Sequence, residues 1–138
     1  MNESSAKLDF KESMYATGRR KTSIAKIWLK KGSGKIYVNG KNYDDYFKRS
    51  NHKMQILRPF EIIDQATQYD VRCQVVGGGH TGQAGAMVHG ISRALVKFDE
   101  NFKTTLRKEK LTTRDSRAVE RKKPGRAKAR KSYQFSKR

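Results

Sequence analysis

The fold is decided by residues 69–98, which read YDVRCQVVGGGHTGQAGAMVHGISRALVKF. In residues 69–76 apolar and polar side chains alternate, and this period of two predicts a half-buried β-strand. Three glycines follow. Apolar side chains then recur at steps of four, three, four and three, at Ala84, Val88, Ile91, Leu95 and Phe98. This spacing predicts one apolar stripe on an amphipathic helix, so a strand, a glycine loop and a core-facing helix are expected in direct succession.

Two further strands are expected before this stretch. Alternating apolar residues predict strands over residues 23–30 and 35–38, with turn-forming residues between them at positions 31–34. The pair Asn39-Gly40 then suits a tight turn that needs positive φ at both positions.

Three short helices complete the expected elements. Helical spacing predicts them over residues 42–48, 52–57 and 101–110. The second is expected to stop at Arg58, because Pro59 disfavours a helical residue before it. Strands and helices are mixed along the chain, so the expected fold class is α+β: a single compact sandwich of a mixed β-sheet with helices packed on it.

The chain divides into a body and a tail. Its 138 residues suffice for one domain with one core. Residues 121–138 contain nine basic side chains, no acid and few large apolar groups, and Pro124-Gly125 breaks any helix there. Such a segment cannot bury enough surface to fold alone. We therefore expect a short lead-in over residues 1–13, a globular domain over 14–111 and an extended basic C-terminal tail over 112–138.

The charge identifies the class of partner. Thirty-two Lys and Arg against 13 Asp and Glu leave a net charge of +19, which favours binding to a polyanion. The chain has no apolar run near the ~20 residues of a membrane span, and neither a basic amphipathic helix with an apolar face nor a lipidation signal. Nucleic acid is therefore expected and a membrane is not. The single cysteine, Cys73, predicts a buried, inert thiol and a reducing compartment.

The glycine block Gly77-Gly78-Gly79-His80-Thr81-Gly82 matches the G-x-G-x-x-G pattern of a dinucleotide site. A dinucleotide fold needs another strand after the helix, and here a second helix and the tail follow. Glycines ahead of a helix N-terminus expose backbone N–H groups that can hold a phosphate. We therefore expect an RNA phosphate near this block, and close helix–strand packing is a compatible structural reason for the glycines.

Two other basic groups are candidates for RNA contact. Arg19-Arg20-Lys21 forms a cationic clamp at the edge of a strand, and Arg20 stands where a Walker motif requires glycine. On the long helix, His89, Arg93 and Lys97 lie in a line at i, i+4 and i+8. This line is either an RNA-binding surface or an ordinary solvated face.

No catalytic or metal-binding group of residues is expected. The histidines at positions 52, 80 and 89 have no metal-ligand spacing to one another or to Cys73. A G-x-S-x-G elbow is absent and acids are scarce. We therefore expect no cofactor, no metal, no small-molecule substrate and no enzymatic activity.

The tail carries the strongest chemical signal. Each Lys or Arg that binds a phosphate releases counterions, and Tyr133 and Phe135 can stack on unpaired bases. Eighteen extended residues span about 60 Å. A free nucleic-acid-binding or chaperone protein has the same features, so composition leaves that alternative open, and the glycine block leaves a nucleotide-dependent enzyme as a weaker one.

The chain resembles the family of small-subunit ribosomal protein nine, in its bacterial and organellar form, over residues 15–138. The motifs that carry this resemblance are Thr17-Gly18-Arg19-Arg20-Lys21-Thr22, Val38-Asn39-Gly40, Tyr46-Phe47, Gly77-Gly78-Gly79, Gly82-Gln83-Ala84-Gly85-Ala86, His89-Gly90-Ile91, Arg93-Ala94-Leu95, Thr113-Arg114-Asp115, Glu120-Arg121-Lys122-Lys123, Lys128-Ala129-Arg130 and Gln134-Phe135-Ser136-Lys137-Arg138. The glycine block and the terminal pentapeptide are specific to that family.

The resemblance implies a left-handed βαβ crossover and a place in the head of the small subunit on the 3′ major domain of the ribosomal RNA, beside other head proteins. The implied ribosomal-RNA contacts are Arg19, Arg20, Lys21, Gly78, Gly79, His80, Gln83, His89, Arg93, Arg114, Arg117, Arg121, Lys122, Lys123, Arg126, Lys128, Arg130 and Lys131. Ser136, Lys137 and Arg138 are implied to touch peptidyl-site tRNA.

Two positions depart from the family pattern. Val88 stands where many relatives carry a basic residue, and Pro124 where bacterial members usually have an aromatic. Lys-Pro-Gly at this place is frequent in mitochondrial relatives, so the expected location is the ribosome of a bacterial cytoplasm or of a mitochondrial matrix.

Overall fold

A five-stranded sheet and four helices form the part of the chain that the structure describes. The computed structural model describes residues 13–64, 68–113 and 124–125. In chain order the elements are β1 (Met14–Arg20), β2 (Ser23–Lys31), β3 (Ile36–Val38), β4 (Lys41–Asn42), α2 (Tyr43–Tyr46), α3 (Ser50–Ile62), β5 (Tyr69–Val76), α4 (His80–Phe98) and α5 (Phe102–Lys108). None of the helices in the described part is long and apolar enough to cross a membrane.

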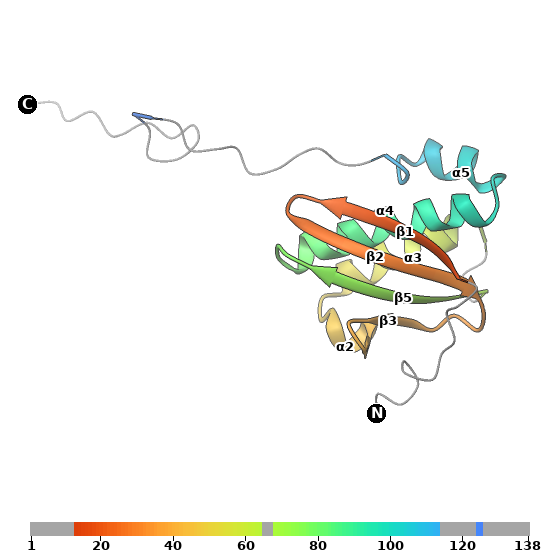
Figure 1. Cartoon of the computed structure of the whole chain (residues 1–138), viewed down its shortest axis with the longest axis horizontal. Coiled ribbons are helices and arrows are strands. Elements are labelled where there is room, and N and C mark those ends of the chain that lie inside the picture. The colour runs from red at the N-terminus through yellow and green to blue at the C-terminus, as the bar shows by residue number, and fades with distance from the viewer. Residues whose placement is uncertain (1–12, 65–67, 114–123, 126–138) are drawn as a thin grey trace, which may run out of the picture.

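The sheet is mixed, with strand order β1-β2-β5-β3-β4. The central strands β2 and β5 are antiparallel, and β3 runs parallel to β5. The chain passes from β3 to β5 through α3. In Figure 1 helices α3 and α4 lie behind the sheet, both parallel strands point to the left, and β5 lies above β3. When the sheet is viewed from the helix side with both strands pointing up, β5 therefore lies to the left of β3. A crossover that moves to the left in this view is left-handed. The expected α+β fold and its rare crossover are confirmed.

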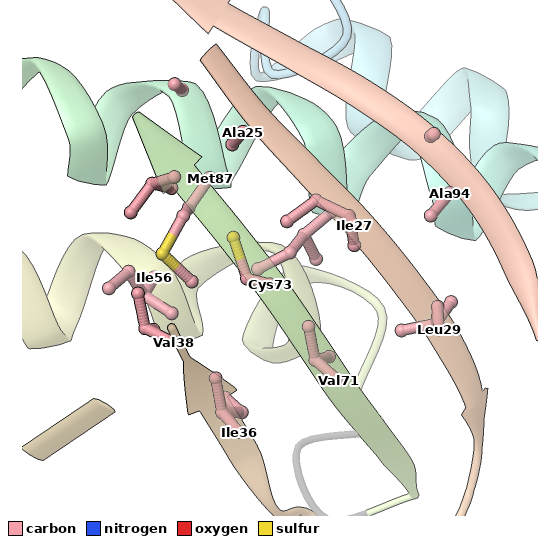
Figure 2. Packing of buried hydrophobic residues seen from close by; sticks show 14 of the residues in the cluster. Ala25, Ile27, Leu29, Ile36, Val38, Ile56, Val71, Cys73, Met87 and Ala94 are labelled. Carbon is pink, nitrogen blue, oxygen red and sulfur yellow. The ribbon is translucent and has the colours of Figure 1, made fainter. Parts of the chain in front are cut away.

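The core lies between this sheet and the helices α3 and α4. On β2, Ala25, Ile27 and Leu29, which the alternation places on one face, are fully buried. Figure 2 shows these residues in one layer with Val71 and Cys73 of β5. This layer faces Ile56 of α3 and Met87 of α4. Burial of a large aliphatic side chain stabilises the fold by about 1.5–3 kcal/mol. The helices cover one face of the sheet only.

Several local expectations are confirmed. The turn after β3 has φ of 51° at Asn39 and 83° at Gly40. The Asn39 amide also bonds the backbone of β5: its Oδ1 accepts from the Val75 N–H at 3.0 Å and its Nδ2 donates to the Val75 carbonyl at 3.1 Å. Cys73 is buried, and this burial raises the pKa of its thiol. The thiol is therefore protonated and inert at neutral pH.

The structure corrects three expectations. Helix α3 does not stop at Arg58 but continues through Pro59 to Ile62. Pro59 and Phe60 are both buried, and this packing outweighs the lost backbone hydrogen bond. Strand β1 was not expected, because its inward positions hold only Ala16 and Gly18. On α4 the predicted stripe is incomplete, since Val88 and Phe98 are half-buried.

Asp70 lies on the predicted polar side of β5, yet only 6% of its surface is exposed. Its Oδ1 accepts hydrogen bonds from the backbone N–H groups of Ser33 (3.0 Å), Gly34 (3.1 Å) and Lys35 (3.0 Å). One carboxylate thus closes the turn between β2 and β3. Three donors on one anion are a strong arrangement, because hydrogen bonds to an ionised acceptor are about twice as strong as neutral ones.

Candidate nucleic-acid interface

A hollow of about 690 Å³ opens at the glycine loop, where three separate parts of the chain meet. We call it the glycine-loop pocket; it is lined by Lys21, Thr22, Ser23, Lys48, Arg49, His52, Gly78, Gly79, His80, Thr81 and Gly82. Lys21, Thr22 and Ser23 come from the β1–β2 hairpin, Lys48 and Arg49 precede α3, and His52 lies in α3. The other five residues form the loop before α4 and its first turn. The lining contains three permanent cations, Lys21, Lys48 and Arg49, and no acid. Its electrostatic potential therefore favours an anion.

The glycines shape the wall of this pocket. Gly77 and Gly78 have φ of 77° and 60°, a left-handed conformation that a side chain disfavours. The Ser23 hydroxyl donates to the Gly77 carbonyl at 3.0 Å and lies where a Cβ on Gly78 would be. Gly79, by contrast, has no neighbour within 4 Å of a Cβ position. The loop is thus anchored on its inner side and open on its outer side.

Helix α4 begins directly at this opening. Gly79 is its N-cap and, having no side chain, makes no capping hydrogen bond to the first turn. The first N–H groups of a helix lack intrahelical partners, and the macrodipole gives this end roughly half a positive charge. Helix and cations thus act on the same space, which makes the pocket suited to a phosphate group.

Gln83 supports the loop from within the protein. Its Nε2 donates to the Gly77 carbonyl at 3.1 Å, and its Oε1 accepts from the Tyr46 hydroxyl at 2.7 Å. The side chain is only 8% exposed. Both of its polar atoms are therefore engaged internally, and Gln83 positions the loop rather than facing the pocket.

His52 forms the floor of the pocket. Its Nε2 lies 3.2 Å from the Thr81 hydroxyl, while its Nδ1 is buried without a hydrogen-bond partner. Burial lowers the pKa of His52, and its electrostatic interactions with Arg49 and His80 lower it further. His52 is therefore neutral at pH 7, and an anion that entered the pocket would favour its protonation.

The basic line of α4 has a structural role that the sequence did not suggest. Strand β1 is at the edge of the sheet, and its outward backbone groups meet this line. Arg93 Nη1 donates to the Thr17 carbonyl at 2.7 Å, and Lys97 Nζ donates to the Tyr15 carbonyl at 2.8 Å. The N–H of Arg19 donates to His89 Nδ1 at 3.2 Å. These side chains form hydrogen bonds with backbone groups of β1 that face away from the sheet. This protects the edge strand from pairing with another chain.

Comparison with known proteins identifies the family of this chain. Residues 18–138 match the model of a family described as Ribosomal protein S9/S16. Small ribosomal subunit protein uS9 of Rickettsia canadensis (strain McKiel) is 54% identical over 132 residues, which cover 96% of this chain and 82% of that protein. The protein of the same name from Rickettsia felis (strain ATCC VR-1525 / URRWXCal2) is also 54% identical, over the same shares. The chain belongs to the ribosomal protein S9/S16 family.

In this member of the S9/S16 family, the structure brings part of the predicted contact set together. Lys21, Gly78, Gly79 and His80 all line the glycine-loop pocket. Arg19 is exposed on β1, outside the pocket. Gln83 supports the loop from within, His89 and Arg93 contact the backbone of β1, and Arg20 ends β1 outside the pocket. The other predicted contacts lie outside the described residues: Arg114, Arg117, Arg121, Lys122, Lys123, Arg126, Lys128, Arg130, Lys131, Ser136, Lys137 and Arg138.

A second basic hollow lies where β1, α3, α4 and the segment after α5 meet. Its volume is about 410 Å³, and its lining includes Arg20, Arg58, Val88, His89 and Lys110. Arg58 also forms an ion pair with Glu109 at 2.9 Å. Val88, one of the two departures from the family pattern, thus stands among cations, so a basic residue at this position would extend the positive surface of the hollow.

Sequence reasoning missed Lys48 and Arg49, which contribute two of the three cations of the glycine-loop pocket. They are adjacent residues directly before a helix, and that pair was the available signal. Lys48 and Arg49 are distant from the glycine block along the chain, so the sequence alone did not show that they line the same pocket. Only the packing of α3 against α4 brings them to the pocket.

Proposed function

We propose that this S9/S16 family member is a structural constituent of the small ribosomal subunit that binds small-subunit ribosomal RNA through the glycine-loop pocket. The observation that carries the proposal is the convergence of Lys21, Lys48 and Arg49 with the uncapped start of α4 on one acid-free hollow. The names of the two Rickettsia relatives supply the small subunit as the assembly. The family resemblance supplies the 3′ major domain in the head, with other head proteins as neighbours.

The chemistry of the pocket fits an RNA phosphate. Lys and Arg donate charge-assisted hydrogen bonds to phosphate oxygens, and Arg does so with two parallel bonds. Helix α4 begins at the same pocket, and the first backbone N–H groups of a helix favour a phosphate. These contacts position RNA without reading its bases. Specificity then comes from the shape of the folded RNA that presents the phosphate.

The tail completes the proposed function. Thr113, near the start of the tail, lines the second basic hollow. On the family resemblance, the cations from Arg114 to Lys131 bind ribosomal RNA along the way, and Ser136, Lys137 and Arg138 contact the tRNA in the peptidyl site. The body thus anchors the chain to the subunit and the tail carries its contact to the decoding region.

The pocket is tested with the double variant Lys48→Gln/Arg49→Gln and the matched control Lys35→Gln/Lys41→Gln. Both remove two exposed positive charges, but only the first removes them from the pocket. Affinity for a transcript of the 3′ major domain is measured against salt concentration. The pocket variant should bind more weakly and with a salt slope shallower by about 1.5, because each phosphate contact contributes about 0.7–0.9. An equal loss in the control would mean that net charge alone acts.

Location on the ribosome is tested separately. Cell lysate is sedimented and each fraction is analysed by mass spectrometry. The protein should travel with small subunits. A protein found mainly in the ribosome-free fractions would instead favour the alternative of a free nucleic-acid-binding protein or chaperone.

A further inference from the structure

The face of the sheet that the helices leave uncovered carries a row of aromatic and cationic side chains, of which Tyr37, at one end, is only 8% exposed. Tyr15 pairs with Trp28 across β1 and β2, Trp28 pairs with Arg72 across β2 and β5, and Arg72 pairs with Tyr37 across β5 and β3. Directly paired residues point to the same face, so the four side chains follow one another across four strands. The ring centroids of Tyr15 and Trp28 are 5.3 Å apart, and the Arg72 guanidinium lies 5.5 Å from the Trp28 centroid.

Positive charges surround this row. Lys26 and Lys30 lie on the same face of β2, two residues on each side of Trp28 and therefore about 7 Å from it. Arg19 lies on the same face of β1. Asp70 is the one acid on this face in the described strands, and it is buried in the turn after β2. The surface is thus aromatic and cationic without an exposed acid.

We propose that this face is a second RNA-binding surface, on which unpaired bases of a single-stranded RNA segment stack on Tyr15, Trp28 and Arg72 while Lys26 and Lys30 bind its phosphates. Aromatic rings and guanidinium planes stack on bases of any sequence. The charge complements a polyanion. A protein partner is less suited, because of the exposed large apolar side chains of the described residues only Tyr15 and Val76 lie on this face, and Val76 is four residues along β5 from Arg72.

The surface shares no residue with the glycine-loop pocket, so it depends on the proposed function only for the class of ligand. The pocket binds phosphates and can hold a duplex or a folded RNA. The sheet face requires free bases. The two sites therefore respond differently to a ligand that carries charge but has no bases.

Trp28 is the sole tryptophan of the chain, so its fluorescence reports directly on this face. The full-length protein is titrated with an oligouridylate of about ten nucleotides and, separately, with heparin. The oligouridylate should quench Trp28 emission at saturation, whereas heparin should bind without comparable quenching. Unchanged emission with saturating oligouridylate, or equal quenching by heparin, would overturn the proposal.

The Lys48→Gln/Arg49→Gln variant separates this proposal from the function proposed above. Saturating oligouridylate should still quench the Trp28 emission of this variant, whether or not the variant has lost its affinity for the ribosomal transcript. Loss of the quenching at saturation would mean that the signal came from RNA in the pocket, and the sheet-face proposal would fail.

The variants Trp28→Thr and Ile24→Thr provide the second test. Both replace a half-buried residue on the same face of β2 with a residue that favours strands, and only the first removes a ring. Affinity for labelled oligouridylate is measured by fluorescence anisotropy, and circular dichroism checks folding. Trp28→Thr should weaken binding at least about fivefold, the cost of one lost stacking contact, while Ile24→Thr and Trp28→Phe should change it little. Equal affinities of Trp28→Thr and Ile24→Thr would overturn the proposal and leave a protein as the occupant of this face.

Discussion

Gly18 of β1 and Gly90 of α4 lie directly against each other, with no side chain between strand and helix. A Cβ on Gly90 would lie 3.0 Å from the Gly18 nitrogen and 2.6 Å from Cγ1 of Ile27. Neither glycine has a positive φ, so both are required for space and not for backbone conformation. This close approach allows the basic line of α4 to reach the edge of β1.

Replacing Gly90 should therefore destabilise the fold. We expect Gly90→Ala to lower the free energy of unfolding by about 1–3 kcal/mol, the usual cost of overpacking, despite a gain of up to about 1 kcal/mol in helix propensity. Urea denaturation followed by circular dichroism measures the change. Gly85→Ala is the control, because its Cβ would meet only the flexible Arg20 side chain. A loss of equal size at both positions would argue against backbone contact as the cause.

Asp70 should be a major determinant of stability at the β2–β3 turn. Asp70→Ala leaves three backbone N–H groups without their acceptor, and we expect a loss of about 3 kcal/mol in the free energy of unfolding. Asp70→Asn keeps an acceptor oxygen and should lose less. Gln74→Ala, an exposed position on the same strand, is the control. If the Ala and Asn variants at position 70 were equally stable, the hydrogen bonds would not be the source of the effect.

His52 should make the fold less stable in acid. Its pKa in the folded protein is below the ordinary value of 6.5, so the unfolded chain binds more protons as the pH falls. Its contribution to stability is complete above pH 6.5 and is lost as the pH falls through the folded-state pKa. The His52→Gln variant should therefore show a weaker decline in unfolding free energy between about pH 7 and pH 5. Asn51→Gln, at an exposed neighbouring position of α3, should keep the decline of the unmodified chain, and a His52→Gln profile of the same steepness would contradict the prediction.

The contact between Arg93 and Thr17 should protect the edge of β1. Arg93→Gln removes a hydrogen bond of 2.7 Å to the Thr17 carbonyl, and we expect a stability loss of about 0.5–1.5 kcal/mol. The opened edge should also increase self-association of the free protein, measured by analytical ultracentrifugation. Lys103→Gln removes an exposed charge from α5 and serves as the control. Self-association of both variants to the same degree would indicate an effect of net charge.

The end of the tail should act on tRNA and not on assembly. Deletion of Ser136–Arg138 should leave incorporation into small subunits intact, because the body and the preceding cations are unchanged. Retention of tRNA in the peptidyl site should fall, since cationic contacts to its phosphates are lost. Filter binding of tRNA to purified ribosomes that carry the truncated chain measures this effect. Unchanged tRNA affinity would remove the proposed role of these three residues.

The sequence by itself determined the parts of this protein that depend on local pattern. Alternation over residues 69–76 predicted which side chains of β5 face the core, and the Asn39-Gly40 turn has the predicted positive φ angles. The family motifs identified the chain, as the later comparisons confirmed. Local periodicity and turn chemistry sufficed here because each depends on residues adjacent in the chain.

The tertiary structure alone decided what depends on residues distant in sequence. Pro59 remains helical because its neighbours are buried, and β1 becomes a strand because it pairs with β2 beneath α4. Lys48 and Arg49 join the glycine loop only when α3 packs against α4. Burial and long-range pairing carry more free energy than a local propensity, and they are not encoded in any short segment. The glycine block therefore predicted a phosphate site, and the fold supplied most of the positive charge of the glycine-loop pocket.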